Sequence, residues 1–465
     1  MISRATTGRI MAKLRATPVH LPAHHDVVEG AARAMNSLDG GGSLDASVHD
    51  QVSGMRCSRV FGARKSVNRA GERAQGFDTL EIDMGLDRVV ALELSNREAA
   101  QTVARRLAHD PGVEWAMPEP LAHAPLLAAA EPAVTLPDPE IVAEPHHRVR
   151  ASQALAIEPG SADIRVAVID TGMALEHPEF DGRIHGGLDT VDLGMGTLAS
   201  GIELVGDSKG RDFCARDETG HGSHVAGIIG ARGLGIMPGI GGAAGLIPVR
   251  ALAAARGAGG RVVGIGGTID IDAAIKTAVD FGARVLNLSL GTSEHDVMEG
   301  LPAVHGDSIA YAQAQGAICV AAMGNSGKEE RYFPAVLPGV IAVGAMEATG
   351  YRARFSTLGD HVTLCAPGTD VISAGLRGYK PSTGTSHAAP FVSGTVALML
   401  SLADRHGARL SAHTITSILT STAAPGKSPT REIGAGCLDA GAALAATRDL
   451  LQQKGGGADA DTPKS

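Results

Sequence analysis

Hydrophobic and polar residues follow two different patterns along the chain, and the first lies between residues 51 and 122. There, DTLEIDMG and RVVALELS alternate between apolar and polar positions like two strands that flank a short turn. NREAAQTVARRLAHD follows with apolar residues at helical spacing, and VEWAMPEP has the pattern of a further strand. We therefore expect a small α+β unit with an antiparallel sheet over residues 51–122, after a polar and poorly ordered N-terminus over residues 1–50.

The second pattern begins at Ile164. Short, continuous apolar runs such as IRVAVID and VIAVGA alternate with helical stretches such as IDAAIKTAVDFG. Strands without polar alternation are buried on both faces, and strands separated by helices imply βαβ crossovers. We therefore expect a parallel α/β domain over residues 147–448, followed by a disordered tail over residues 449–465.

Residues 123–146 separate the two patterns and are rich in proline. The prolines of this segment are Pro125, Pro132, Pro137, Pro139 and Pro145. Proline lacks a backbone N–H and fixes φ, so prolines at this density interrupt helices and central strands. We predict that this segment is a linker and the boundary between two domains.

Composition narrows the class of protein. The chain of 465 residues has a net charge of −9, which argues against binding to nucleic acid or to an anionic membrane surface. We see no run that approaches the ~18–20 apolar residues of a membrane helix, so no membrane span is expected. Five cysteines without a C-x-x-C spacing support neither a disulfide scaffold nor a zinc ribbon.

The first residues leave the compartment open. They are basic but lack the apolar stretch of a secretory signal, so no signal peptide is recognised. We accordingly leave the localisation unknown, between the cytoplasm and export by a non-classical route.

Three short segments carry chemistry. Asp170 ends the apolar strand in VAVIDTG, His221 opens a helix of small residues in GHGSHVAG, and Ser386 opens a long apolar helix in STGTSHAAPFVSGTVALML. An Asp, a His and a Ser together can activate a hydroxyl nucleophile: the serine attacks a carbonyl, the imidazole takes its proton, and the carboxylate orients the imidazole. A serine at a helix N-terminus also has a backbone N–H that can donate to an anion beside the hydroxyl.

Over about residues 150–448, the chain resembles the subtilisin-like (subtilase, S8) serine endopeptidases. The resemblance rests on DTG, HGSHVAG and GTSHAAP in the order Asp, His, Ser. It implies a three-layer parallel sheet with helices on both faces. It also implies a broadly specific serine endopeptidase made as an autoprocessed zymogen, with the 51–122 unit as its propeptide.

The same resemblance assigns further residues. AAMGNSG matches the family's oxyanion segment and places Asn325 as a side-chain donor to the oxyanion, alongside the N–H of Ser386. NLSLG matches the strand edge that pairs with an extended peptide. The substrate-binding residues implied are Ser289, Leu290, Gly291, Ala322 and Gly324. Pairing with an edge strand reads the peptide backbone, so broad specificity follows.

Cofactors and partners follow from the same motifs. The stretch after the His221 helix, ARGLGIMPGIGGAAG, lacks Asp, Asn and Glu, so we expect no metal and no calcium site there, and leave calcium elsewhere open. The expected partners are protein or peptide substrates and the chain's own propeptide in cis, with no nucleic acid. We expect a monomer.

Three alternatives stay open at this stage. The domain could be a catalytically silent or permanently prodomain-inhibited binding module. His387, beside the nucleophile, is either a packed residue or a second titratable group near the site. Glu329 or Glu330 either favours basic residues in the substrate or faces solvent.

Overall fold

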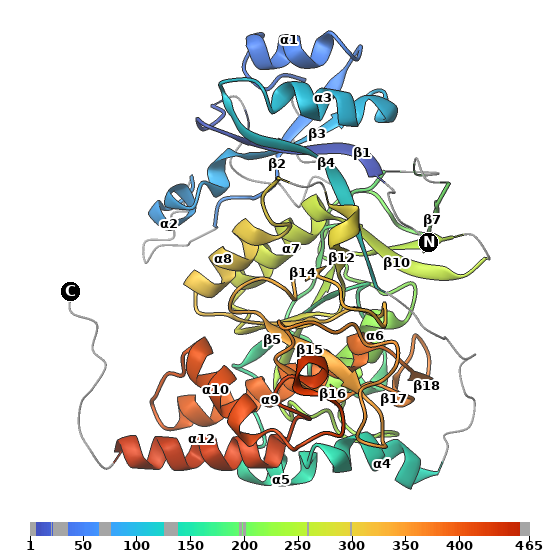
Figure 1. Cartoon of the computed structure of the whole chain (residues 1–465), viewed down its shortest axis with the longest axis vertical. Helices are drawn as coiled ribbons and strands as arrows, with labels where there is room; N and C mark the ends of the chain where they lie inside the picture. The colour runs from blue at the N-terminus through green and yellow to red at the C-terminus, as the bar shows by residue number, and fades with distance from the viewer. Residues whose placement is uncertain are drawn as a thin grey trace.

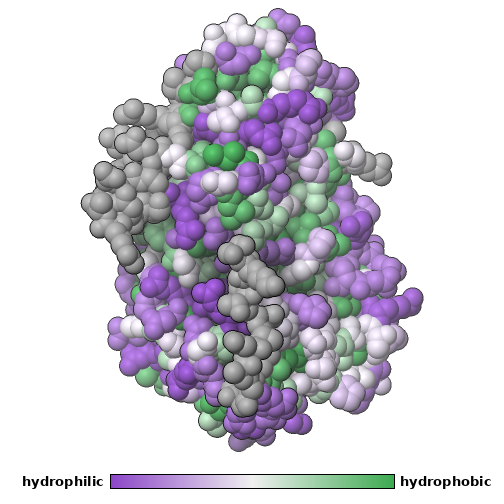
Figure 2. Space-filling model, turned by 90° about the vertical axis from the view of Figure 1, so that its left-hand side faces the viewer, coloured by the Kyte–Doolittle hydropathy of each residue, from purple (hydrophilic) through white to green (hydrophobic). Residues whose placement is uncertain are grey.

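The computed structural model describes residues 6–19, 21, 36–64, 76–124, 138–194, 198, 201–257, 260–297 and 300–455. Figure 1 shows a smaller N-terminal unit stacked on a larger domain, with α4 (Pro139–Arg148), α5 (Ala151–Ile157) and α12 (Ala440–Gly455) at the far end. Hydrophilic residues cover much of the face in Figure 2, and hydrophobic residues are interspersed among them.

The N-terminal unit is an antiparallel sheet covered by helices. Its strands lie in the order β2 (Met55–Arg59), β3 (Val89–Leu94), β1 (Thr6–Leu14) and β4 (Val113–Ala124). Helices α1 (Ser43–His49) and α3 (Ala100–Leu107) share a buried apolar cluster with one face of this sheet. The opposite face, which includes Met11 and Met117, packs on the larger domain.

Two expectations for this unit are wrong. Among the described residues of the segment 1–50, Thr6–Leu14 is not poorly ordered, because it forms β1 and pairs with both β3 and β4. Alternate residues such as Ile10 and Ala12 are buried beneath the helices, and this stabilises the strand. DTLEIDMG is not a strand, because Asp78 and Glu81 form a capping box that begins helix α2 (Thr79–Asp83).

The predicted linker is shorter than 123–146 within the described residues. Strand β4 extends to Ala124, and helix α4 (Pro139–Arg148) begins with Asp138 as N-cap and a proline in its first turn. Proline is favoured there because the first N–H groups of a helix have no intrahelical partner. Residues 125–137 lie outside the described part. The expected tail is also shorter, since α12 (Ala440–Gly455) includes residues 449–455.

The larger domain is built on a seven-stranded sheet with parallel pairing, and the predicted α/β fold class is confirmed. In spatial order, its strands are β16 (Leu364–Pro367), β15 (Ile341–Met346), β13 (Ile318–Ala322), β11 (Val285–Leu288), β5 (Arg165–Asp170), β8 (Gly245–Arg250) and β6 (Leu188–Asp189).

Helices cover both faces of this sheet. Alternate strand residues separate into two cores, one with α6 (His221–Gly230) and α9 (Thr385–Arg405), the other with α7 (Thr268–Asp280) and α8 (Gly306–Ala314). Further elements of this domain are α5 (Ala151–Ile157), α10 (Ala412–Thr422), α11 (Thr430–Ile433), β12 (Thr292–Ser293), β14 (Tyr332–Phe333), β17 (Val371–Ala374) and β18 (Tyr379–Ser382).

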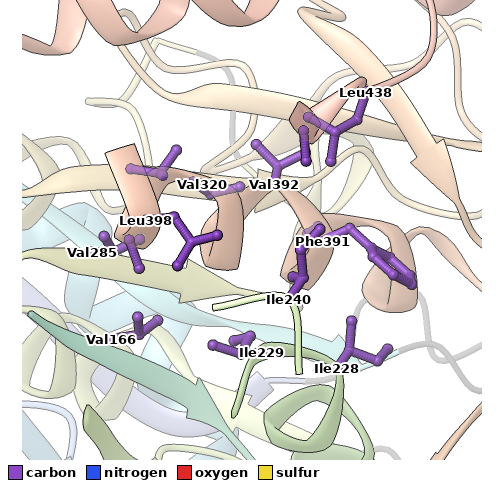
Figure 3. Packing of buried hydrophobic residues seen from close by; sticks show 14 of the residues in the cluster. Val166, Ile228, Ile229, Ile240, Val285, Val320, Phe391, Val392, Leu398 and Leu438 are labelled. Atoms are coloured by element: carbon purple, nitrogen blue, oxygen red, sulfur yellow. The ribbon is translucent and has the colours of Figure 1, made fainter. Parts of the chain in front are cut away.

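Helix α9 runs through the first of these cores. Figure 3 shows Phe391, Val392 and Leu398 of this helix beside strand residues such as Val166 and Val285. Among the described helices, α9 alone has the length and apolar composition of a membrane span, contrary to the expectation of no such stretch. Its whole apolar window is buried inside the structure, as in the core helix of a globular protein.

A feature that the sequence did not predict joins the two parts. Strand β4 continues from the N-terminal sheet and pairs with β10 (Val262–Gly267), which pairs in turn with β9 (Ala253–Arg256) and β7 (Glu203–Val205). One continuous sheet therefore extends from the N-terminal unit into the larger domain (Figure 1).

Candidate active site

Asp170 and His221 meet at the C-terminal edge of the parallel sheet. Asp170 is the last residue of β5, and His221 is the first residue of α6. The His221 Nδ1 lies 2.7 Å from the Asp170 Oδ1, and both side chains are fully buried. This contact assigns the Nδ1 proton to the aspartate side of the ring, while Nε2 has no hydrogen-bond partner among the described residues.

Asp217 holds the segments on either side of this pair, and the motif analysis missed it. Its Oδ1 accepts hydrogen bonds from the Thr171 hydroxyl at 2.8 Å and the Gly220 N–H at 2.9 Å. Its Oδ2 accepts from the N–H and the hydroxyl of Ser223, at 2.9 and 2.7 Å. A buried carboxylate that accepts from this many donors holds the end of β5 next to the start of α6. An acidic residue four positions before His221 was the available signal.

The close packing of β5 against α6 requires a glycine at position 222. A Cβ on Gly222 would lie 2.1 Å from the carbonyl oxygen of Gly172. No side chain fits at that distance, so the glycine of the GHGSHVAG motif permits the approach of His221 to Asp170.

Ser386 lies in the first turn of α9 and contacts the predicted substrate edge. Its hydroxyl donates to the Ser289 carbonyl at 3.1 Å, and the Ser289 hydroxyl donates to the Ser386 carbonyl at 2.8 Å. The structure therefore pairs Asp170 with His221 and Ser386 with Ser289. The ring of His387, next to Ser386 in the chain, lies 5.4 Å from the His221 ring, centroid to centroid.

Asn325 lies beside the start of α9. Its Oδ1 accepts from the N–H of Thr385 at 3.0 Å and from the Thr385 hydroxyl at 2.9 Å. With Oδ1 held by two donors of one residue, the amide group has a defined orientation, which is what an oxyanion donor requires. Gly324 and Ala322, the other predicted residues of this segment, are buried just before it. Thr385 is a second residue that the motif analysis did not single out.

The predicted substrate edge is occupied by the N-terminal unit. His123 of β4 and Gly291 exchange both backbone hydrogen bonds, at 3.1 and 3.2 Å. On its other side, β4 pairs with β10 through residues 121–124. The end of β4 thus lies as an extended strand between β10 and the Ser289–Leu290–Gly291 segment.

His387 is a packed residue and does not titrate near neutrality. It is fully buried, its Nε2 lies 2.7 Å from the Ser382 hydroxyl, and its ring lies 4.4 Å from that of His224. Burial is the main cause that holds the pKa of His387 well below its ordinary value. The positive charges that could form on its neighbours His224, His221 and Lys380 lower this pKa further. Burial likewise lowers the pKa of His224 to about 3. Both rings are therefore neutral at neutral pH.

The loop after the His221 helix is held by a carboxylate. Glu179 accepts from the N–H groups of Gly233, Leu234 and Gly235 at 2.7 to 3.1 Å, and from the Tyr379 hydroxyl at 2.8 Å. Burial acts to raise the pKa of Glu179, but these donors lower it overall. Within the described part of the chain, no three His, Cys, Asp or Glu side chains group together as a metal site would require.

The two acids after Asn325 have different surroundings. Glu329 is exposed to solvent, while Glu330 is partly buried and accepts a hydrogen bond from the Ser293 hydroxyl. His295 is its other neighbour, with 3.9 Å between Nε2 and the Glu330 Oε1. Glu330 is therefore engaged within the domain.

Comparison with known proteins identifies the family. Residues 161–436 match the model of the subtilase family (Peptidase_S8), so the chain belongs to that family. It is 36% identical over 244 residues to a thermophilic serine proteinase of Bacillus sp. (strain AK1), covering 52% of this chain and 53% of the relative. It is 31% identical over 255 residues to thermitase of Thermoactinomyces vulgaris, covering 55% of this chain and 80% of thermitase.

Solved structures agree with this assignment. A protease from Pseudoalteromonas arctica PAMC 21717 superposes with a TM-score of 0.55 at 27% identity, covering 67% of this chain and 98% of that one. The predicted family is confirmed, and the Bacillus relative is named as a serine proteinase. The chain spans about half the length of the Bacillus relative.

Proposed function

We propose that this chain is a serine endopeptidase in which Ser386 is the nucleophile, His221 the general base and then acid, and Asp170 the orienting carboxylate. The observation that carries the proposal is the fully buried Asp170–His221 contact of 2.7 Å, which leaves Nε2 without a partner among the described residues. Buried polar atoms are rarely left unpaired, and an unpaired Nε2 beside a serine-bearing helix fits a proton acceptor.

In the proposed reaction, the Ser386 hydroxyl leaves the Ser289 carbonyl, attacks the substrate carbonyl carbon and passes its proton to the Nε2 of His221. The oxyanion accepts hydrogen bonds from the Asn325 amide and the Ser386 N–H. The protonated imidazole then donates to the leaving amine as the peptide bond breaks. Water then attacks the acyl carbon while His221 takes one of its protons; the ester bond to Ser386 breaks, His221 returns the proton to the Ser386 oxygen, and the carboxylic acid product leaves.

We infer further that the N-terminal unit is an inhibitory propeptide in cis. Support comes from the position of β4, whose residues 121–124 pair with β10 and with Gly291 as an extended peptide would. The pairing is antiparallel, so in a bound peptide of the same register the residue two positions after the one facing Gly291 would lie opposite Ser289, beside the proposed nucleophile. We therefore propose autoprocessing between residues 122 and 150, a range that includes residues 125–137 outside the described part.

The interface between the two parts contains buried ion pairs. Arg9 of β1 contacts Glu119 at 2.7 Å and Asp270 of α7 at 2.9 Å. Glu119 also accepts from the N–H of Ile269 at 2.9 Å, at the start of α7. These contacts join the N-terminal unit to the helix behind the substrate edge, which supports a specific inhibitory complex. A permanently inhibited module is the alternative.

A fluorophosphonate probe tests the proposal, because it labels only a serine that is activated as a nucleophile. The full-length protein is incubated with the probe and with casein, in parallel with the Ser386→Ala variant. We expect labelling and casein cleavage in the wild type, and neither in the variant. A well-folded wild-type protein that neither reacts nor cleaves would favour the silent or permanently inhibited module.

We propose in addition that the enzyme acts as a monomer on polypeptide substrates without a metal cofactor. The absence of a metal from the loop after the His221 helix is supported by Glu179. Its carboxylate accepts hydrogen bonds from the backbone N–H groups of that loop and so holds the loop without an ion.

A further inference from the structure

Leu121 of β4 is buried in an apolar cluster that belongs otherwise to the larger domain. It is 6% exposed. The residues that share this cluster are Val191, Leu193, Leu198, Ile202, Ala253, Ala255 and Ile265, with Leu204 and Val263 packed against it. Every one of them lies between residues 191 and 265. Leu121 is thus the one side chain that the N-terminal unit contributes to the cluster as described.

Strand register explains how this cluster forms. Ile265 lies opposite His123 on β4 and opposite Ala253 on β9, while Ala255 lies between Val263 and Leu204. Residues directly opposite in an antiparallel pair point to the same face of the sheet, as do residues two apart along one strand. Leu121 therefore shares one face of the β4-β10-β9-β7 sheet with the cluster residues of the other three strands.

The segment between Asp170 and His221 covers this face. It contributes Val191, Leu193, Leu198 and Ile202, and the Leu198 N–H donates to the Ile202 carbonyl at 2.9 Å. Arg250, 2% exposed, anchors the segment at both ends through Asp189 at 2.6 Å and Glu218 at 2.8 Å. These anchors lie within the larger domain, and Arg9 of β1 adds a hydrogen bond of 2.7 Å to the Asp192 carbonyl of the same segment.

The other face of β4 has a different character. Ala122 and Ala124 point away from Leu121 and belong to the core that includes Leu252 and Leu290. The end of β4 therefore presents a bulky apolar side chain to one pocket and two small side chains to the opposite wall.

We propose that this pocket, hereafter the Leu121 pocket, is a substrate subsite for one bulky apolar side chain, two residues N-terminal to the residue that pairs with Gly291. The inference rests on the proposed function, since it requires that β4 mark the path of a substrate. Removal of β4 would expose the apolar walls now covered by Leu121, and a substrate strand in the same register would cover them again. The subsite would add a preference for one kind of side chain to an edge that otherwise recognises only the peptide backbone.

Synthetic peptides with the sequence of residues 117–131 test this directly, with the processed wild-type enzyme. The variants carry Leu121→Ala, Leu121→Phe, Leu121→Asp or His123→Ala, and mass spectrometry confirms that the same bond is cut in each. A pocket that loses several methylene groups of its ligand should lose roughly tenfold or more in kcat/KM. We expect that loss for Leu121→Ala, a larger one for Leu121→Asp, and little change for the partly exposed control position His123.

An enzyme variant gives the reciprocal test. Leu193→Ala should enlarge the pocket and raise the ratio of kcat/KM for the Leu121→Phe peptide over the parent peptide, with fluorophosphonate labelling as the check that the variant folds. If the Leu121→Ala and parent peptides are cleaved equally well at the same bond, the proposed subsite is wrong, while the proposed endopeptidase function is supported. If no peptide is cleaved and no label is taken up, the proposed function is wrong and the subsite with it.

Discussion

His123 and Gly291, far apart in the chain, exchange both of their backbone hydrogen bonds, at 3.1 and 3.2 Å. Through this pair, the last strand of the N-terminal unit becomes the neighbour of the segment that contacts Ser386. The pair also fixes which residues of β4 face which walls of the cleft. In the proposed function, the inhibitory strand and a substrate therefore bind in the same register at the same edge.

The orientation of Asn325 provides a prediction about kcat. Replacing it by leucine removes the amide, and we expect a loss of about 10²–10³ in kcat with little change in KM, the figure known from subtilisin for an oxyanion donor. Thr385→Val keeps the N–H but removes the hydroxyl donor to Oδ1, so its loss should be smaller. Steady-state kinetics on a peptide substrate measures both, with Ser326→Ala as the matched control. A rise in KM at unchanged kcat for Asn325→Leu would contradict the role.

The Arg9 ion pairs predict how firmly the N-terminal unit docks. The carboxylates of Asp270 and Glu119 raise the pKa of Arg9 above its ordinary value, against the effect of burial. Arg9→Met would leave two buried carboxylates without this partner, a change that costs about 3–5 kcal/mol. Arg56→Met breaks an exposed pair with Glu93 in the same unit and should cost about 1 kcal/mol or less.

Urea unfolding measures this difference, with Ser386→Ala as the background in both variants so that self-cleavage does not interfere. Equal stabilities for the Arg9 and Arg56 variants would show that the buried pairs do not hold the unit in place.

His146, His224 and His387 are buried in their neutral form, so we expect the protein to lose stability in acid. His146 allows the clearest test. Its ring lies 5.1 Å from that of Phe391, and neither nitrogen has a hydrogen-bond partner among the described residues. Burial lowers its pKa from about 6.5 to about 4. Between these values, the unfolded chain binds the proton and the folded chain does not, so stability falls as the pH falls through that window.

His146→Leu should remove up to about 3 kcal/mol of this acid sensitivity. The fall in Tm between pH 7 and pH 4.5 would then be smaller than in the parent, again with Ser386→Ala as the background. His413, which is exposed on α10, offers the control substitution His413→Gln. An identical fall in Tm for the His146 variant and the parent would exclude the buried imidazole as a cause.

The loop after the His221 helix predicts independence from calcium. A structural ion present at a hundred times its Kd would contribute about 2.7 kcal/mol, so its removal by EDTA would lower the Tm measurably. We expect the Tm to stay the same with EDTA and with added calcium. Glu179→Gln should instead lower it in both conditions, because the three N–H groups lose a charged acceptor. Calcium-dependent stability in the wild type would place an ion elsewhere in the domain.

The motifs predicted that Asp170 and His221 lie together, and the structure brings them into contact, because each lies at the end of an element that its local sequence defines. Local patterns failed where distant partners decide the structure. Strand β1 carries Arg9 and Lys13, which look like surface residues, yet both are buried and paired with Asp270 and Asp307 of the larger domain. A sequence pattern does not show such a partner, so the strand was interpreted as a poorly ordered end.

The strands β10, β9 and β7 escaped prediction for a related reason. VVGIGG and AAAR are rich in glycine and alanine, and neither has the bulky alternation of a typical strand. Small residues suit this position, because a Cβ on Gly266 would lie 2.4 Å from the Ala251 carbonyl oxygen. The Leu121 pocket becomes visible only when these strands are aligned with β4 and the covering segment.

A comparison of two proteins shows whether Ser386 cleaves the chain's own segment after β4. The full-length wild type and the Ser386→Ala variant are purified in parallel, incubated, and subjected to N-terminal sequencing and intact-mass measurement. We predict a new N-terminus between residues 122 and 150 in the wild type, and an intact chain in the variant. The same cleavage in the Ser386→Ala protein, free of contaminating protease, would contradict the mechanism.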